Sequence, residues 1–173
     1  MFLTRTKESW TTLNTFPGDI AQSVSVIHRA YQRDARLFFK GLNLNSTSAY
    51  ILLILCKKGS FSQNELSREL LINKGQIARE VKRLVTNGFV TQVQSEENHT
   101  VNVVTITPEG KKLIPRIVDY RNDWWNSRLQ QIDATPDSPL AQSLYTIGRQ
   151  LIANQDHDRL AALANGRQGM TAF

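Results

Sequence analysis

The chain has 173 residues, 21 of them basic and 15 acidic, with a formal net charge of +6 and a pI near 9.7. This length suits one domain with appended helices, and the positive charge favours a nucleic-acid partner. Runs of about 18 apolar residues and a signal-peptide core are absent, and the single cysteine excludes an internal disulfide. We therefore expect a cytoplasmic protein without a membrane span.

Two helices are predicted in the first third of the chain. After a polar lead-in, Asp19 should cap a long helix that runs to about Gly41, with the three-four apolar spacing of an intertwined dimer helix. Asn45 and Ser46 should begin the next helix, which Lys57-Lys58-Gly59 closes. The apolar positions of the first helix are Ile20, Val24, Ile27, Tyr31, Phe38 and Leu42.

The second helix contains the run Ile51–Cys56, which is apolar on all sides and should lie at the centre of the core. Its cysteine has two interpretations. Cys56 could sense oxidants as a thiolate, or it could be a buried and unreactive core residue. The apolar neighbours favour the structural interpretation.

A helix-turn-helix is predicted over residues 62–88. Ser62 and Glu65 have the spacing of a capping box, which begins a short helix. Asn73 is suited to cap the following helix, and Gly88 is suited to end it. The buried side of the short helix should carry Leu66 and Leu70.

The second of these helices has two distinct faces at about 100° per residue. One face is apolar, with Ile77, Val81, Leu84 and Val85. The opposite face has cations and an amide but no acid, which suits a polyanionic groove; Glu80 lies nearer the apolar edge, within reach of Arg83 or Lys82. The residues of this opposite face are Gly75, Gln76, Arg79, Lys82, Arg83 and Thr86.

Two alternating runs, 89–94 and 101–106, follow this helix and predict strands joined by a polar turn. The order of elements predicts a mainly α fold with a small β-wing, a winged helix-turn-helix, whose usual function is to hold a helix in the DNA major groove. Without this order, a basic helix face would indicate only an ordinary solvated surface.

Two further helices are predicted towards the C-terminus. Thr107 should cap a long helix with Pro108 at its first position and Pro115 as an interior kink. A loop over residues 133–139 leads to a last helix from Pro139 to Asn154 or beyond, and residues 166–173 should fray. One side of the long helix should carry Leu113, Ile117, Tyr120, Trp124 and Ile132.

Three runs resemble the MarR family of transcriptional regulators: 62–67, 73–84 followed by Asn87-Gly88-Phe89-Val90, and 103–110. The resemblance covers residues 46 to about 115 and implies a homodimer with interlocked terminal helices, which represses transcription until a small ligand or oxidant releases it. It implies an N-terminal extension (1–18), a dimerisation region (19–45 and 111–165), a DNA-binding domain (46–110) and a flexible tail (166–173).

The helix-turn-helix supplies the expected DNA contacts. Arg79 and Gln76 are expected to read bases, because guanidinium and amide groups pair with guanine and adenine edges. Phosphate contacts are expected from Lys74, Lys82, Arg83 and Ser62. The predicted DNA-binding residues are Ser62, Asn73, Lys74, Gly75, Gln76, Arg79, Lys82, Arg83 and His99.

The wing departs from the family pattern, in which an Asp-x-Arg sequence sends an arginine into the minor groove. The matching positions here are Asn98, His99 and Thr100, beside Glu96 and Glu97. The two glutamates would be repelled by phosphates, so His99 is the remaining contact on the wing. The turn also has Leu71 where the family often has glycine, which predicts a slightly different backbone geometry.

The resemblance also implies an effector site between the dimerisation helices and the DNA-binding lobe. Candidates with aromatic rings and polar groups are His28, Tyr31, Tyr50 and Trp124, which suit a small aromatic or phenolic ligand. The same residues could be plain core, and Trp124 with Trp125 could anchor the dimer interface.

Enzyme chemistry finds no support in the motifs, since the three histidines are isolated and no metal or cofactor motif is present. We expect no cofactor, no metal and no catalytic residue. Two functions stay open: a ligand-responsive regulator that binds double-stranded DNA as a dimer, and a winged-helix module for protein interaction or architecture without sequence-specific DNA binding. The basic helix favours the first, and the wing favours the second.

Overall fold

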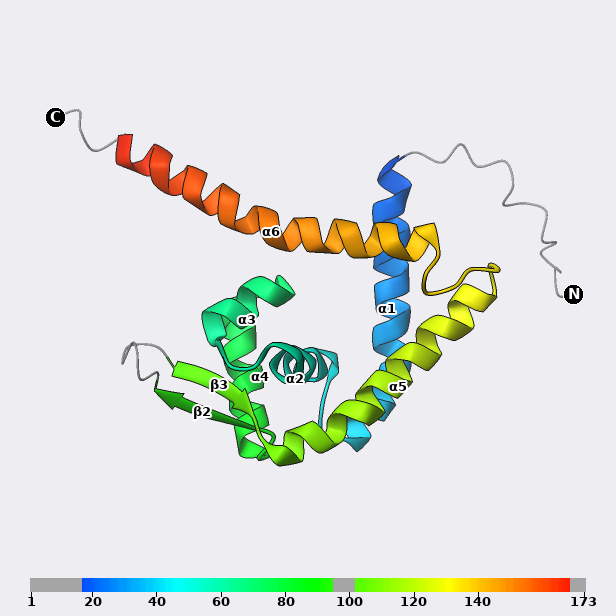
Figure 1. The fold of residues 1–173 in the computed structure, drawn as a ribbon, viewed down its shortest axis with the longest axis horizontal. Helices are drawn as coiled ribbons and strands as arrows, with labels where there is room; N and C mark the ends of the chain where they lie inside the picture. Colours follow the sequence, from blue (N-terminus) through cyan, green and yellow to red (C-terminus); the bar gives the residue numbers. More distant parts are fainter. Residues whose placement is uncertain (1–16, 95–101, 169–173) are drawn as a thin grey trace, which may run out of the picture.

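The fold was described from a computed structural model, which covers residues 17–94 and 102–168, excluding the side chains of Pro17 and of residues 156–168. It is mainly α-helical with one small sheet (Figure 1). In chain order the elements are α1 (Pro17–Gly41), α2 (Ser46–Lys58), β1 (Phe61–Ser62), α3 (Gln63–Leu70), α4 (Lys74–Thr86), β2 (Val90–Gln94), β3 (Asn102–Ile106), α5 (Pro108–Gln130) and α6 (Pro139–Gln168).

The helices divide into a compact lobe and a set of long flanking helices (Figure 1). Helices α2, α3 and α4 gather with the sheet in the lobe, where α3 packs against α4 and α2 contacts α4 and β3. Helix α5 leads away from the sheet past α2 and α1, and α6 returns across α1 towards α3, which it contacts. The lobe therefore has the arrangement of a winged helix-turn-helix.

A continuous apolar core joins the lobe to α1 and α5. Helix α2 lies at its centre and packs against α1, α4, α5 and β3. Burial of these side chains removes apolar surface from water, which is the main favourable contribution to folding. Its most buried large side chains include Phe39, Ile51, Leu52, Leu55, Leu66, Ile77, Leu84 and Ile117.

Local capping signals define the starts of four helices. The Asn45 side chain accepts from Ser48 N, and the Ser62–Glu65 pair forms the complete capping box. Asn73 accepts from Gln76 N at 2.8 Å, and Thr107 accepts from Gly110 N with Pro108 in the first turn. All four satisfy backbone N–H groups that the helix itself leaves unpaired, as the sequence predicted.

The sheet contains one strand that the sequence did not reveal. The two predicted strands, β2 and β3, pair antiparallel with Val90 opposite Ile106. Strand β1 then joins the far edge of β3 in the order β1-β3-β2, with Phe61 opposite Val104. Two residues are too few to produce an alternating pattern, so only pairing with a distant strand defines β1.

Three helix boundaries differ from the prediction. Helix α1 begins at Pro17, so Asp19 lies in its first turn, where its charge suits the helix dipole, and does not cap it. Helix α5 ends at Gln130, and Ile132 is therefore an exposed loop residue. Helix α6 continues to Gln168, which lies inside the region expected to fray.

Two apolar residues expected in the core lie at the surface. Cys56 is exposed although it lies on the same side of α2 as the buried Ala49 and Leu52, because it belongs to the last turn of the helix, where Lys57 and Lys58 are exposed too. The interpretation of Cys56 as a buried core residue is therefore wrong. Val85, at the edge of the apolar face of α4, is also exposed.

The turn between α3 and α4 has the left-handed backbone conformation that glycine favours, although the residue there is Leu71. Leu71 has φ 55° and ψ 36°, the left-handed conformation, and its N–H bonds back to Arg68 O. The expected change in turn geometry is therefore not observed; the leucine adopts the conformation that glycine favours. Gly88 likewise has φ 73° directly after α4.

A close contact at Gly110 fixes the start of α5 against the end of α4. The Thr107 N–H donates to Phe89 O at 3.0 Å, and its hydroxyl donates to Gly88 O at 2.8 Å. A Cβ at Gly110 would lie 2.2 Å from Phe89 O, so no larger residue fits there without movement. These contacts hold α4, which becomes the recognition helix in a helix-turn-helix, in a fixed position relative to the sheet and α5.

Candidate nucleic-acid interface

Helix α4 presents a cationic face to solvent. Lys74, Gly75, Arg79 and Lys82 are exposed, and Gln76 is half-buried. The buried face of the same helix carries Ile77, Val81 and Leu84. Because α4 has a single acidic residue, and that residue points elsewhere, its outward face offers cations and amides only.

The N-cap residues of the lobe are partly occupied by their own helices. Asn73 uses its side-chain oxygen to accept from Gln76 N, which leaves its amide N–H groups without a partner among the described residues. The Ser62 hydroxyl donates to Glu65 Oε2 at 2.7 Å. Ser62 would therefore have to give up this bond in order to donate its hydroxyl hydrogen to a DNA phosphate. The Gln76 side chain has no hydrogen bond to any described residue.

Glu80 ties α4 to the start of α2. Its carboxylate accepts from Asn45 Nδ2 at 2.9 Å and from Ser48 Oγ at 2.7 Å. It also forms an ion pair with Arg83 Nη2 at 2.8 Å, with 14% of the Glu80 side chain exposed. This network, Asn45–Ser48–Glu80–Arg83, connects the recognition helix to the cap of the central helix.

Arg83 was predicted to lie on the solvent-exposed cationic face of α4, but this network holds its guanidinium against α2. Its guanidinium also donates to the Ser48 hydroxyl, and its Nε is buried without a hydrogen-bond partner in the described part of the chain. Helical periodicity placed Arg83 on the cationic face because a periodic pattern contains no information about Ser48, which lies 35 residues earlier. The side chain remains 40% exposed, so one edge of the guanidinium is still accessible.

The predicted effector residues lie in two environments. Tyr31 and Trp124 are buried and meet edge to face at 5.2 Å, within an aromatic cluster that also contains Phe38 and Tyr120. The Trp124 indole donates to Asp34 Oδ2 at 3.1 Å, and this bond, more than that from Arg33, lowers the pKa of Asp34.

Tyr31 holds an unsatisfied group in this cluster. Its hydroxyl is buried and forms no well-aligned hydrogen bond to a described residue, although Tyr50 lies close by. Burial, with a smaller contribution from Tyr50, raises the pKa of Tyr31 above the ordinary value. Buried hydroxyls normally have partners, because an unpaired one costs about 1–3 kcal/mol. The orphaned hydroxyl is a place where a ligand or water could bind.

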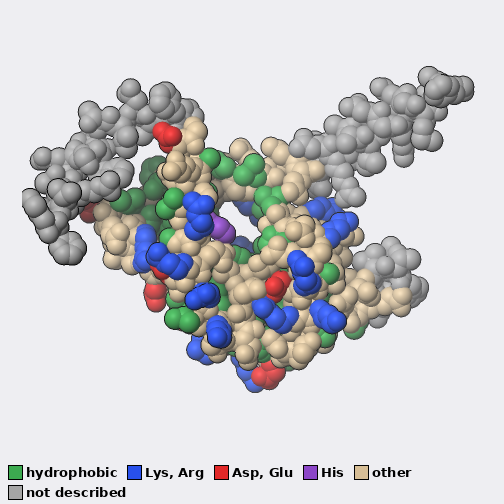
Figure 2. Space-filling model, turned by 180° about the vertical axis from the view of Figure 1, so that it is seen from behind, with side chains coloured by type: hydrophobic (Ala, Val, Ile, Leu, Met, Phe, Trp, Pro, Cys, Tyr) green, Lys and Arg blue, Asp and Glu red, His purple; other side chains and the backbone are tan. Residues whose placement is uncertain are grey.

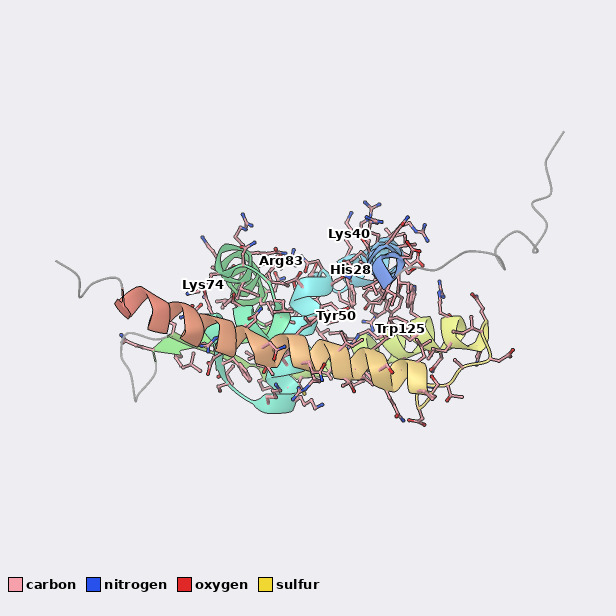
Figure 3. All side chains as sticks on the ribbon, turned by 90° about the horizontal axis from the view of Figure 1, so that it is seen from above. His28, Lys40, Tyr50, Lys74, Arg83 and Trp125 are labelled. Atoms are coloured by element: carbon pink, nitrogen blue, oxygen red, sulfur yellow. The ribbon has the colours of Figure 1, made fainter. Side chains whose placement is uncertain are left out.

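Tyr50 lies near the Tyr31 hydroxyl, whereas His28 lies apart from the buried pair. Tyr50 is half-buried beside Arg121, whose guanidinium lies 5.2 Å from its ring centroid. It lines a hollow of about 190 Å³ together with Arg121, Lys57 and apolar residues of α2 and α3. His28 is exposed on α1, 3.5 Å from Gln32 Nε2. Figure 3 labels both residues together with Lys74 and Arg83 of α4.

Sequence reasoning missed Asn45, Ser48 and Arg121 as members of these sites. Asn45 had a signal as a helix cap, but its second role depends on Glu80 far along the chain. Arg121 had no local signal. The predicted wing residues His99, Glu96, Glu97 and Thr100 lie outside the described residues.

Two absences apply to the described ranges 17–94 and 102–168. Within them, no three His, Cys, Asp or Glu side chains group in a way that could hold a metal ion. No helix there has the length and apolar character that crossing a membrane requires.

The three-stranded wing, the capped turn and the exposed helix define a winged helix-turn-helix protein. Residues 41–99 match the model of the MarR family. The chain is 24% identical over 100 residues to the HTH-type transcriptional regulator BilQ of Clostridium symbiosum, covering 58% of this chain and 69% of BilQ. It is 26% identical over 97 residues to the uncharacterised HTH-type transcriptional regulator YybA of Bacillus subtilis, covering 56% of this chain and 65% of YybA.

Among solved structures, a MarR-family regulator from Listeria monocytogenes in complex with a 26mer DNA superposes with a TM-score of 0.66 at 21% identity, covering 84% of this chain and 94% of that one. Over residues 41–99 the chain is therefore similar to the MarR family of helix-turn-helix transcriptional regulators, and it shares the fold of the solved structures.

Proposed function

We propose that this protein is a repressor that binds a pseudo-palindromic DNA operator as a homodimer in the cytoplasm and is released by a small aromatic effector. The observation that carries the DNA-binding part is the outward face of α4, where Lys74, Arg79 and Lys82 are exposed and no acid intervenes. A helix with such a face fits the negative potential of a major groove. The Listeria regulator of the same fold was solved in complex with a 26mer DNA, which supports DNA as the partner of this chain.

Within this proposal the side chains divide by role. Arg79, near the middle of the exposed face, reads a guanine edge, and Gln76, whose amide is free of internal bonds, pairs with adenine. Lys74 and Lys82 hold phosphates, and Gly75 lets the backbone approach them. Asn73 offers its free amide N–H groups to a phosphate. Ser62, Arg83 and the wing residue His99 contribute less.

The proposed homodimer rests on apolar surface that a monomer would expose to water. On α1, Ile20 is 63% exposed, and Val24 and Ile27 are exposed beside it. On α6, exposed apolar residues recur at three- and four-residue intervals, forming a stripe. Monomers rarely leave such surface uncovered, so a second copy is its natural partner. The α6 stripe consists of Leu140, Leu144, Ile147 and Leu151.

The proposed effector site is the hollow beside Tyr50. Its apolar walls suit an aromatic ring, and Arg121 and Lys57 at its rim suit a carboxylate or phenolate. The buried pair Tyr31 and Trp124 lies behind Arg121 and could repack when a ligand enters, while His28 lies further out. A ligand at this position touches both α2 and α5, and so links the lobe to the dimerisation helices.

A genomic-fragment selection with the purified protein tests the proposed function. A sequence-specific repressor should enrich one inverted-repeat motif, and purified operator should be released by aromatic acids in the same assay. Binding to fragments without enrichment would instead support the second candidate, an interaction or architectural module. Arg79→Ala serves as the matched control, since it should weaken the enrichment and broaden the enriched motif while the protein stays folded.

A further inference from the structure

Helix α1 carries a second cationic surface, separate from the recognition helix. Arg29, Arg33, Arg36 and Lys40 are all exposed. At about 100° per residue they fall within about 60° of one another, on the side of α1 opposite to Ile20 and its apolar neighbours. We refer to these four residues as the α1 basic stripe. The proposed dimer contact on α1 would therefore leave the stripe open.

The stripe borders a groove at the junction of α1 and α2. The groove has a volume of about 630 Å³ and is lined by Arg33, Arg36, Lys40 and the turn residues Leu44–Ser46. Arg36 and Lys40 form no ion pair with any described residue, whereas Arg33 pairs with Asp34 at 2.9 Å. Asp34 is directed at Trp124 and Arg128, so its charge is largely engaged away from the groove.

The stripe and the recognition helix face the same side of the molecule. Seen from behind, Lys and Arg side chains gather in two groups on one face, on either side of a central hollow (Figure 2). Seen from above, Lys40 on α1 and Lys74 and Arg83 on α4 lie towards the same side (Figure 3). A straight polyanion resting on α4 would thus pass over or near α1.

We propose that the α1 basic stripe is a second anchor for double-stranded DNA, which holds the sugar–phosphate backbone beyond the segment read by α4. The inference rests on the proposed function and extends its footprint. From Arg29 to Lys40 the stripe spans about 16 Å at 1.5 Å per residue, which corresponds to about five base pairs along the DNA axis. Flexible cations without internal partners make contacts to phosphate that carry no sequence information.

The test compares DNA affinity as a function of salt for three forms of the full chain. Arg36→Gln with Lys40→Gln removes two stripe cations without disturbing an ion pair. Lys111→Gln with Arg116→Gln removes the same charge from exposed positions on α5. Each form is titrated with operator and with random duplex, and thermal melting checks that all three are equally folded.

The stripe variant should lower the slope of log affinity against log salt by about 2, about one per cation, and weaken operator and random duplex alike. The α5 variant should leave the slope within about 0.5 of the wild type. An unchanged slope in the stripe variant, or an equal fall in both, would overturn the second anchor while leaving operator binding intact. If the wild type bound no duplex at all, both the anchor and the proposed function would be wrong.

Discussion

At the scale of single residues, Arg79 and Lys82 should separate base reading from phosphate binding. Both are exposed on α4 without an internal partner among the described residues. Arg79→Ala should lose about 1–3 kcal/mol on the operator and relax discrimination, because a bidentate contact to one base is lost. Lys82→Ala should weaken all duplexes alike and flatten the salt dependence by about 1. Equal losses for Arg79→Ala on operator and random DNA, measured by fluorescence anisotropy, would contradict this assignment.

Leu71 gives a second prediction at this scale, which concerns stability. It is held at φ 55° with its side chain 47% exposed, so the left-handed backbone is strained and little packing compensates. Leu71→Gly should leave the free energy of unfolding within about 0.5 kcal/mol of the wild type, because relief of strain offsets the added chain entropy. Leu71→Val should lower it by about 1–2 kcal/mol, since β-branched residues tolerate this conformation poorly. Urea unfolding at one protein concentration measures both, and equal stability of the two variants would rule out strain at this turn.

At the scale of elements, the sequence predicted what local interactions determine. The capping box of Ser62 and Glu65, and the caps Asn73 and Thr107, follow from groups three residues apart, so they are readable in order along the chain. Features that depend on distant neighbours were missed. Strand β1 exists only because β3 lies beside it. Cys56 is exposed because the packing that buries Ala49 and Leu52 on the same side of α2 does not extend to the last turn of the helix.

The candidate DNA-binding residues also divide into those that local sequence predicts and those whose position depends on distant neighbours. The exposure of Lys74, Arg79 and Lys82 follows from helical periodicity, which a sequence displays directly. The engagement of Arg83 does not, because its partner Ser48 belongs to another helix. The helical period shows on which face of a helix a residue lies. The position of the charged group at the end of a long side chain depends on its partners in other elements of the fold.

The Glu80 network makes this difference measurable. Glu80→Ala removes the acceptor for Asn45 and Ser48 and leaves the half-buried Arg83 cation without its ion pair. We expect a loss of about 1–3 kcal/mol in the free energy of unfolding, reduced from the fully buried case by the exposure of Arg83. Glu109→Ala breaks an ion pair of the same i, i+3 spacing whose side chains are 70% and 62% exposed, and should cost less than about 1 kcal/mol. Similar losses in the two variants would mean that the network does not hold α4 to α2.

At the scale of the whole molecule, we expect the exposed apolar stripe on α6 to decide the oligomeric state. Ile147 lies in the middle of this stripe and is 53% exposed, while Thr146 lies on another side of the same helix. The wild type should sediment as a dimer of the 19.6 kDa chain at micromolar concentration, because the stripe is covered only by a second copy.

Ile147→Glu should shift the protein towards the monomer, since dimerisation would then bury an unpaired charge, whereas Thr146→Glu should leave the dimer intact. Two-fold symmetry links this result to DNA binding. A dimer positions two recognition helices on half-sites about one helical turn apart, so the Ile147→Glu variant should also lose the requirement for an inverted repeat and bind single half-sites weakly. Sedimentation velocity and binding to operators with one or two half-sites measure both effects. A wild-type monomer that binds a single half-site as tightly as the full operator would show that these long helices serve something other than self-association.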